Sequence, residues 1–325
     1  MTPLSSPVKI AVIGPGALGT LFAARLALAG NSVLLLDYRP ERARLLAERG
    51  LHVRAPSGDF SQQVCVTADP NLLAGVDAAL VFVKSYQTEQ VAALLADCLA
   101  SDAVALTLQN GLGNVETLQL HLGQYRVFGG ATAQGALLEA PGVVHDTGGG
   151  PTVLGRPDGQ PDDRLEALAK VLLLAGFSVS ITRDLPVAIW TKAILNAAIN
   201  PIAALTRLRN GALVEHEPAL RLMTAAAREA YSIARKHGIN VARQDWRARL
   251  LTICQATAPN INSMLQDVLH ARRTEIDALN GAITRIAEQH KVQATVNRSL
   301  WYLVNTLEMS YGAAVEHTET RTDTD

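Results

Sequence analysis

Residues 8–40, "VKIAVIGPGALGTLFAARLALAGNSVLLLDYRP", decide the fold expected for the first half of the chain. Two short runs rich in β-branched residues and leucine flank a longer segment with helical character, which is typical of a strand–helix–strand unit. Gly14, Gly16 and Gly19 stand directly after the first run, where the helix begins. This position makes an otherwise weak glycine motif specific. The stretch therefore predicts a parallel βαβ unit with a glycine turn.

The glycine turn predicts a binding site for a dinucleotide. Gly14 permits the tight turn, Gly16 lets the backbone approach a pyrophosphate, and Gly19 lets the helix lie close to the sheet. Free N–H groups at the positive end of the helix then bind the anion. The residues expected at the cofactor are Gly14, Pro15, Gly16, Ala17, Leu18 and Gly19.

Two residues at the end of the second strand favour different cofactors. Asp37 would accept hydrogen bonds from the adenosine ribose of NAD and repel a 2′-phosphate. Arg39 would instead pair with that phosphate. A third interpretation is that both side chains only solvate the strand end, so NAD and NADP stay open at this point.

The pattern along the chain predicts two domains, as expected for 325 residues. Further strands are expected in "DAALVFVK" and "AVALTLQN", a helix over about 162–175, and a strand in "FSVSIT". The glycine-rich stretch 126–155 predicts short antiparallel strands appended to the sheet. From Asp184 to about residue 312 the pattern is helical. We predict an α/β dinucleotide-binding domain over 1–183, an all-helical domain over 184–315 and a polar, frayed tail over 316–325.

Composition favours a small-molecule partner in the cytoplasm. A net charge of −1 gives no general attraction to nucleic acid or to an anionic membrane. Neither a span of about 20 apolar residues nor a signal peptide is evident. The three cysteines lack CxxC spacing, which argues against a disulfide framework or a structural zinc site, and no metal is expected. Whether the chain forms a homodimer stays open.

Two polar residues follow the next predicted strands. Lys84 and Asn110 stand at strand ends, where ligands of open α/β sheets bind. A lysine there is also common as a solvated charge. Asn110 is the more specific signal, because Gly111 and Gly113 predict a second tight strand-to-helix turn beside it.

A polar stripe marks the segment "IWTKAILNAAIN", residues 189–200. Lys192, Asn196 and Asn200 repeat every four residues, so a helix places them on one side. Asp184 is the expected cap, and Pro201 is expected to kink or end the helix. The stripe would be a solvent face or a ligand site. One cation and two amides favour the site, with Lys192 as proton donor to a forming alkoxide.

Ser263 and Glu275 supply further candidate polar groups. Ser263 with Gln266 fits a helix capping box, which is the alternative to a role at a substrate. An unbroken helix would place Ser263 and Glu275 about 18 Å apart. Either the helix is interrupted between them, or the two residues serve different ends of the site.

The segments "GPGALG", "VKSYQT", "LQNGLGN", "WTKAILNAAINPIAAL" and "NSMLQDVLHARRTEIDALNG" together resemble the ketopantoate reductase (2-dehydropantoate 2-reductase) family, in family order over nearly the whole chain. The resemblance implies a Rossmann-type N-terminal domain, a helical C-terminal domain and an active site in the cleft between them. It implies catalytic roles for Lys192 and Glu275, substrate binding by Asn110, Asn196, Asn200, Asn210 and Ser263, and cofactor binding by Lys84 and Asn110.

The implied reaction is NAD(P)H-dependent reduction of 2-dehydropantoate to pantoate, in pantothenate and coenzyme A biosynthesis. The family implies NADP(H), but this chain has Tyr38 where relatives commonly carry an arginine for the 2′-phosphate, and Asp37 keeps NAD(H) open. One alternative is an NAD-dependent 2-hydroxyacid dehydrogenase of the same scaffold that uses another branched 2-keto acid. A second is a non-catalytic nicotinamide-binding sensor.

Overall fold

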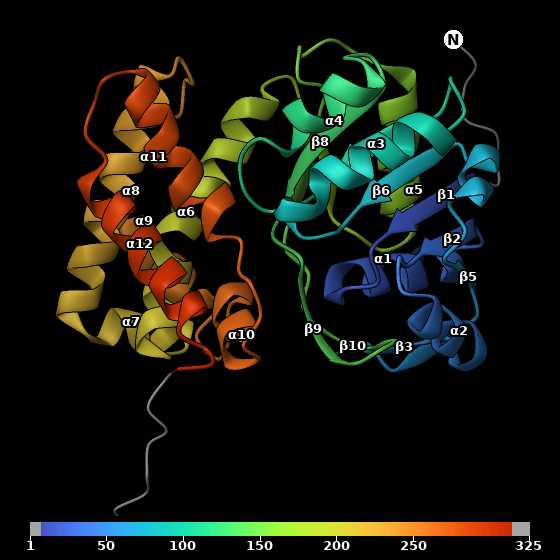
Figure 1. Cartoon of the computed structure of the whole chain (residues 1–325), viewed down its shortest axis with the longest axis horizontal. Coiled ribbons are helices and arrows are strands. Elements are labelled where there is room, and N and C mark those ends of the chain that lie inside the picture. The colour runs from blue at the N-terminus through green and yellow to red at the C-terminus, as the bar shows by residue number, and fades with distance from the viewer. Residues whose placement is uncertain (1–7, 314–325) are drawn as a thin grey trace, which may run out of the picture. The chain divides into compact units, whose positions relative to one another are not determined.

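The computed structural model describes residues 8–313, which divide into two compact units (Figure 1). The first unit ends at Ala193 and also includes Ile239–Val241. The second comprises Ile194–Gly238 and the chain from Ala242 onward. The division falls inside a long helix, α6 (Leu185–Thr206), whereas the sequence places the boundary just before that helix. The predicted tail 316–325 lies outside the described residues.

An eight-stranded sheet organises the first unit, with the strand order β12-β11-β8-β7-β6-β1-β2-β5. The strands from β5 to β8 are parallel, while β11 runs antiparallel to β8 and β12 runs parallel to β11. All four strands predicted between residues 8 and 110 are present. The bounds are β1 Lys9–Ile13, β2 Ser32–Leu36, β5 Cys65–Thr67, β6 Ala78–Val81, β7 Val104–Thr107, β8 Val127–Thr132, β11 Thr152–Gly155 and β12 Val179–Thr182.

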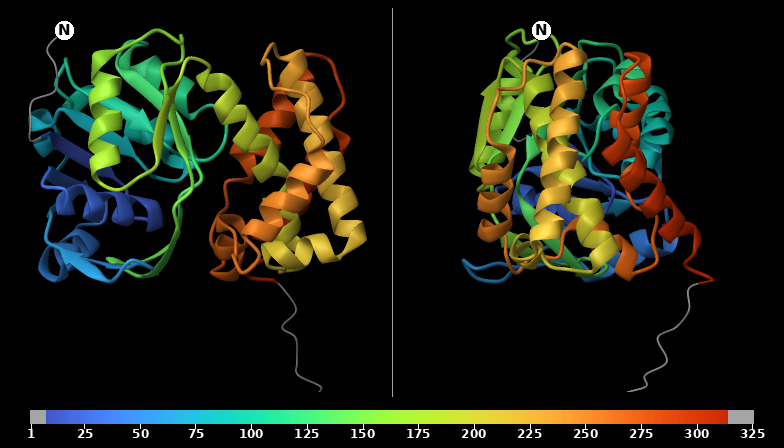
Figure 2. Two further views of the ribbon diagram at one scale, coloured as in Figure 1. Left: turned by 180° about the vertical axis from the view of Figure 1, so that it is seen from behind. Right: turned by 90° about the vertical axis from the view of Figure 1, so that its left-hand side faces the viewer.

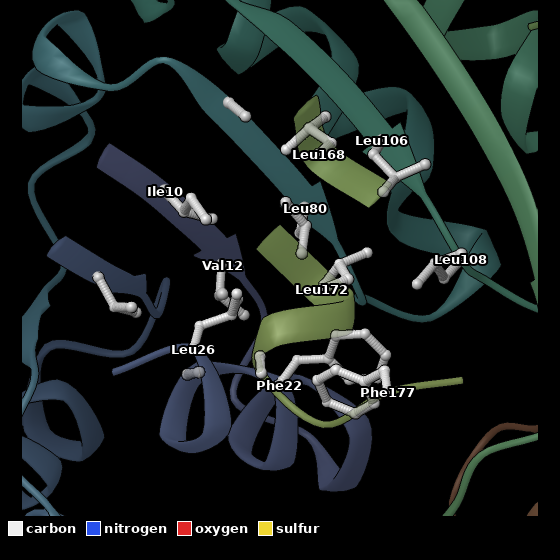
Figure 3. Packing of buried hydrophobic residues seen from close by; sticks show 14 of the residues in the cluster. Ile10, Val12, Phe22, Leu26, Leu80, Leu106, Leu108, Leu168, Leu172 and Phe177 are labelled. Atoms are coloured by element: carbon white, nitrogen blue, oxygen red, sulfur yellow. The ribbon is translucent and has the colours of Figure 1, made fainter. Parts of the chain in front are cut away.

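Apolar side chains point to both faces of the central strands, and nearly all of them are buried. This pattern is typical of a parallel sheet covered by helices on both faces. On one face, Ile10 and Val12 of β1 belong to one apolar cluster with Phe22 of α1 and Leu172 of α5 (Figure 3). Leu95 of α3 and Leu118 of α4 belong to the cluster on the other face. The helices are α1 Ala17–Leu28, α2 Pro40–Arg49, α3 Thr88–Cys98, α4 Asn114–Leu122 and α5 Asp163–Leu174, with 3-10 turns η1 Pro70–Gly75 and η2 Ser85–Gln87.

The region 126–155 differs in part from its prediction. Four short strands form there, but only β8 and β11 join the main sheet, and β8 pairs parallel with β7. The hairpin β9 (Gly135–Ala140) and β10 (Val143–Gly148) belongs to a second, four-stranded sheet with β3 (Leu51–Arg54) and β4 (Phe60–Gln62). β10 pairs parallel with β3, far away in the chain. Such pairing is non-local, so glycine and turn patterns do not indicate it.

The described part of the second unit is built from helices, turns and loops, as predicted (Figure 2). Helix α8 contacts α7, α9, α11 and α12. After α6 the helices are α7 Asn210–Glu215, α8 Glu217–Lys236, α9 Trp246–Ala256, α10 Ser263–Leu269, α11 Asn280–Gln289 and α12 Thr295–Met309, with the 3-10 turn η3 Ile276–Ala278.

Helix α6 is the one segment of the described chain that is long and apolar enough to cross a membrane by length and composition. Within the structure, 61% of its most apolar window is buried. Burial of that extent is also found for a core helix of a globular protein, so the length and composition of α6 are weak evidence for a membrane span.

Candidate active site

The glycine turn between β1 and α1 has the geometry that a dinucleotide needs. Gly14 has φ +102°, a conformation that side chains with a Cβ rarely adopt. A Cβ on Gly19 would lie 2.0 Å from the carbonyl oxygen of Gly14, so this position requires glycine for the close approach of helix and loop. A Cβ on Gly16, by contrast, would meet no described heavy atom within 4 Å.

The first turn of α1 is open to an anion. Gly16 is the N-cap residue, and no side chain of the described residues caps the helix there. The backbone N–H groups of Ala17, Leu18 and Gly19 are therefore at the positive end of the helix dipole without a capping acceptor. The free space above Gly16 and these donors fit the pyrophosphate of a dinucleotide cofactor.

The end of β6 lies beside the glycine turn. A Cβ on Gly14 would be 2.9 Å from Cγ1 of Val83, the neighbour of Lys84. Lys84 is partly buried and immediately precedes η2, whose last residue Gln87 donates its N–H to the Lys84 carbonyl at 2.8 Å. Lys84 thus follows the end of β6 by three residues, in the loop beside the glycine turn, and its contact with a cofactor stays a prediction.

Side chains that the sequence did not single out connect the two strand-end loops. Gln109 donates from Nε2 to the carbonyl oxygen of Val83 at 2.8 Å and to the Thr88 hydroxyl at 2.9 Å. That hydroxyl donates to Oδ1 of Asn114 at 2.8 Å, and Asn114 donates from Nδ2 to the carbonyl oxygen of Asn110 at 2.9 Å. The chain of bonds fixes the loop of Lys84 to the loop of Asn110. The only sequence signal was the cluster of polar residues after each strand.

The second tight turn after β7 is present as predicted. Gly111 and Gly113 both have φ +93°, and Gly113 precedes α4. Asn110 lies at the start of this turn and is partly buried. The turn brings the Asn110 backbone and amide to the carboxyl edge of the sheet, where ligands of such folds bind.

Asp37 has a partner that changes its interpretation. Its side chain is fully buried and forms a salt bridge with Arg42 from the first turn of α2, with Arg42 Nη2 2.8 Å from Asp37 Oδ1 and a second, very short bond from Nε. The hydrogen bond to Asp37 raises the pKa of the Arg42 guanidinium, against the opposing effect of burial. Arg42 therefore neutralises the carboxylate that argued against a 2′-phosphate.

Arg39 contacts Tyr38 rather than Asp37 through its side chain. Its Nε donates to the Tyr38 hydroxyl at 2.9 Å, and its guanidinium carbon lies 5.2 Å from the centre of the ring. Its backbone N–H donates to Asp37 at 3.1 Å. Tyr38 and Arg39 are exposed, so an aromatic ring and a cation border the end of β2.

Helix α6 begins where the sequence predicts. Asp184 caps it, accepting a hydrogen bond from the Val187 N–H at 3.3 Å. The helix is continuous through Lys192, Asn196 and Asn200, so helical geometry places the three on one side. Lys192 and Asn196 are partly buried, and Asn200 is only 6% exposed. The solvent-face alternative fits poorly with a side chain as buried as that of Asn200.

Pro201 does not end this helix, so of the two predicted effects, a kink or an end, the end is wrong. The helix runs through Pro201 to Thr206. A proline has no N–H for the carbonyl of the residue four positions earlier, which is Ala197. The Nδ2 group of Asn280 donates to this carbonyl at 2.9 Å and replaces the missing bond.

The start of α10 excludes one of the two interpretations of Ser263, the capping box. Asn262, not Ser263, is the N-cap residue, and its side chain accepts from the Leu265 N–H at 3.0 Å. Gln266 donates to the carbonyl of Ile261 at 2.7 Å instead of completing a capping box with Ser263. Both Asn and Ser are good caps, so the sequence does not distinguish two neighbours. The Ser263 hydroxyl is thereby released from the capping role.

Asn210 is buried and supports the same loop. It donates from Nδ2 to the Thr257 hydroxyl at 3.0 Å and accepts from Asn262 Nδ2 at 3.3 Å. Its backbone N–H also donates to the carbonyl of Asn260 at 3.1 Å. These bonds tie Asn210 to the segment leading into Ser263, and its expected contact with substrate stays a prediction.

The helix is interrupted between Ser263 and Glu275, which decides between the two sequence alternatives. Helix α10 ends at Leu269, and Glu275 is the N-cap residue of η3. Glu308 of α12 holds the turn by accepting from the N–H of Thr274 at 2.9 Å and from its hydroxyl at 2.5 Å. Glu275 is 7% exposed, so a surface charge is not its role.

The candidate residues fall into two groups. The first unit holds the glycine turn, Asp37, Arg39, Lys84, Asn110 and Lys192, and the second holds Asn196, Asn200, Asn210, Ser263 and Glu275. Among the described residues, no three His, Cys, Asp or Glu side chains gather as metal ligands. The first unit has a Rossmann-type sheet and a glycine loop suited to a dinucleotide. A helix that carries a lysine and two amides continues from it into the helical unit. These features are typical of two-domain, dinucleotide-dependent oxidoreductases.

Sequence comparison specifies the family. The model of the family described as "Ketopantoate reductase PanE/ApbA" matches residues 10–159, and that of "Ketopantoate reductase PanE/ApbA C terminal" matches residues 184–308. The chain therefore belongs to the ketopantoate reductase family.

Three relatives show how far the likeness extends. The 2-dehydropantoate 2-reductase of Halobacterium salinarum is 36% identical over 299 residues, covering 91% of this chain and 98% of the relative. The crystal structure of a PanE/ApbA family ketopantoate reductase from Ralstonia eutropha JMP134 has TM-score 0.84 and 31% identity, covering 93% and 99% of the two chains. The ternary structure of D-mandelate dehydrogenase with NADH and anilino(oxo)acetate has TM-score 0.85 and 25% identity, with the same coverage.

Proposed function

We propose that the protein reduces 2-dehydropantoate to pantoate with NADPH, as a cytoplasmic enzyme of pantothenate and coenzyme A biosynthesis. The observation that carries the proposal is the stripe of Lys192, Asn196 and Asn200 along one continuous, capped helix in a member of this family. The names of relatives such as the Halobacterium salinarum enzyme supply the substrate.

Each of these residues has a separate role in the proposed reaction. A bound reduced nicotinamide would supply the hydride to the 2-keto carbon. The Lys192 ammonium donates a proton from Nζ to the carbonyl oxygen as negative charge develops there, and it stabilises that charge before transfer. Asn196 and Asn200 offer amide donors and acceptors in a fixed row that orient the keto acid.

Three further polar groups complete the proposed site. Asn110 would bind at the nicotinamide end, where its turn follows β7. Ser263, whose hydroxyl takes no part in capping α10, would donate to the substrate, and the buried carboxylate of Glu275 would accept from a substrate hydroxyl. Lys84 and the N–H groups at the start of α1 would bind the cofactor.

The salt bridge at the end of β2 supports NADPH. Because Asp37 is buried and paired with Arg42, it does not present an uncompensated charge to a 2′-phosphate. Arg39 adds one cation beside the Tyr38 ring, and the guanidinium of Arg42, paired with Asp37, lies 6.0 Å from the same ring. We infer that these residues replace the arginine that relatives commonly carry at the position of Tyr38.

The test is steady-state kinetics of the wild-type protein with 2-dehydropantoate, an unbranched 2-keto acid and the keto acid of mandelate, each with NADPH and with NADH. We expect the highest kcat/KM for 2-dehydropantoate with NADPH. The second candidate, an NADH-dependent reductase of another 2-keto acid, is favoured by the likeness to D-mandelate dehydrogenase. A higher kcat/KM for either other acid would replace the first candidate with the second.

A further inference from the structure

The buried side chain of Asn280 completes helix α6 between the two amides of the polar stripe. Pro201 leaves the carbonyl oxygen of Ala197 without its intrahelical donor, and Asn280 Nδ2 lies 2.9 Å from that oxygen. Ala197 directly follows Asn196 and lies three residues before Asn200. Asn280 is fully buried, so water does not reach the Ala197 carbonyl from the Asn280 side to replace this hydrogen bond.

A network of polar groups orients the Asn280 amide. Its Nδ2 also donates to Oδ1 of Asn297 at 3.0 Å. Asn297 in turn donates to Oε2 of Glu229 at 2.7 Å and to the carbonyl of Ala226 at 3.2 Å, so its amide cannot be flipped without losing both acceptors. Glu229 also accepts two backbone N–H groups at the start of α12, where a carboxylate favours the helix dipole. These bonds direct the Asn280 donor at α6.

The same residue is directly connected to the turn of Glu275. Asn280 is the first residue of α11 and follows η3, which Glu275 caps. The N–H groups of Ala278 and Leu279 donate to the Glu275 carbonyl at 3.1 and 3.2 Å. The six residues from Glu275 to Asn280 therefore form a compact turn, whose far end is hydrogen-bonded to α6.

We propose that Asn280 is a positioning residue for keto-acid reduction: through its bond to the Ala197 carbonyl it fixes the Glu275 turn against Asn196 and Asn200. The proposal rests on the function proposed above. It assigns Pro201 a role as well, because the proline creates the unpaired carbonyl to which Asn280 binds. All of these residues lie in the second unit, so cofactor binding by the glycine turn does not depend on the link.

A double-mutant cycle with Asn280→Ala and Pro201→Ala tests the proposal. Pro201→Ala restores an N–H for the Ala197 carbonyl, so helix α6 no longer needs the amide. We expect Asn280→Ala to lower Tm by at least about 3 °C in the Pro201 background and by less in the Pro201→Ala background. We expect KM for the 2-keto acid to rise about tenfold in both, because neither background keeps the link between α6 and the Glu275 turn.

Thr284→Val is the matched control. Thr284 is also fully buried in α11, and its hydroxyl donates at 2.8 Å to the Asn280 carbonyl rather than to α6. This variant is expected to lose stability with KM unchanged. The Kd for NADPH is expected to stay at the wild-type value in every variant.

The outcomes separate the two proposals. If Pro201→Ala/Asn280→Ala has the KM of Pro201→Ala alone, Asn280 only fills a gap in a helix, and the positioning role is wrong while the proposed function stands. If the wild-type protein reduces none of the 2-keto acids, the proposed function is wrong and the positioning role with it. Equal Tm losses from Asn280→Ala in both backgrounds would contradict the bond to the Ala197 carbonyl.

Discussion

The glycine turn and the polar helix are built in opposite ways. The turn uses six consecutive residues, 14–19, whose backbone geometry forms the proposed anion site. Helix α6 depends on an amide 83 residues further along the chain, and that amide is oriented by a third and a fourth helix. A site formed by backbone groups is therefore encoded by neighbouring residues, and adding a Cβ disrupts it. A site formed by side chains is encoded by residues far apart in the chain, and removing one of these side chains disrupts it.

The largest effect is expected on the helix side of this comparison. Lys192→Ala removes the proposed proton donor, and we expect kcat for keto-acid reduction to fall by at least about a hundredfold, with the Kd for NADPH nearly unchanged. Lys170→Ala on the exposed face of α5 is the control and should leave both constants unchanged. If Lys192→Ala had the same kcat as the wild type, the lysine would have no role in the mechanism. If the protein were a non-catalytic sensor, the wild type itself would show no turnover.

A matched pair of glycine substitutions tests the other side. Gly19→Ala places a Cβ 2.0 Å from a backbone oxygen that cannot swing away, so we expect a loss of about 3 kcal/mol in the free energy of unfolding. Gly16→Ala meets open space, so its stability should change by less than about 1 kcal/mol. Its affinity for NADPH should nevertheless fall, because the Cβ occupies the space of the pyrophosphate. Denaturant unfolding and cofactor titration of both variants separate the two effects.

If Gly16→Ala bound NADPH as tightly as the wild type, the pyrophosphate would not lie over this turn. If Gly19→Ala were as stable as Gly16→Ala, the loop and helix would have room to move apart. Either result would remove the contrast between a backbone site of fixed geometry and a side-chain site.

The smallest effect compares a thiol in each unit. Cys65 of the first unit is exposed, while burial raises the pKa of Cys254 in the second unit from the ordinary 9.0 to about 11. Between pH 9 and pH 11 the Cys254 thiol ionises in the unfolded chain but stays protonated in the folded protein. The stability that the buried thiol contributes is therefore fully present below pH 9 and is lost as pH rises towards 11. Mass spectrometry after maleimide labelling at pH 8 should find Cys65 modified rapidly and Cys254 modified only after unfolding. Equal labelling rates would contradict the burial of Cys254.

Local patterns predicted the parts of the fold and site whose determinants are adjacent in sequence. The βαβ unit, the glycine turn, the turn after Asn110 and the Asp184 cap each depend on residues a few positions apart. The salt bridge of Asp37 spans only five residues, but whether Arg42 turns towards Asp37 or towards solvent depends on the burial of the strand end, which spacing does not reveal. The interpretation of Asp37 as a carboxylate that repels phosphate was incomplete for that reason.

Non-local partners account for the differences. Strands β9 and β10 were predicted as strands, but their sheet was not, because β10 pairs with a strand about ninety residues earlier. Pro201 was expected to kink or end α6 because a local rule allows no donor for the carbonyl of Ala197. The sequence does contain an indication: an apolar helical pattern that continues past a proline leaves a carbonyl that a buried side-chain donor can bind. Asn280 is one of several amides that meet this description, and only the fold selects it.

The proline in α6 also affects the order in which the second unit folds during synthesis. A chain emerging from the ribosome contains Pro201 long before it contains Asn280, so the turn of α6 around Ala197 lacks a donor until at least residue 280 is available. The orienting partner Asn297 arrives later still. Since an unpaired carbonyl costs free energy in an apolar interior but not in water, we expect the core around this turn to reach its full stability only after nearly the whole second unit has been synthesised.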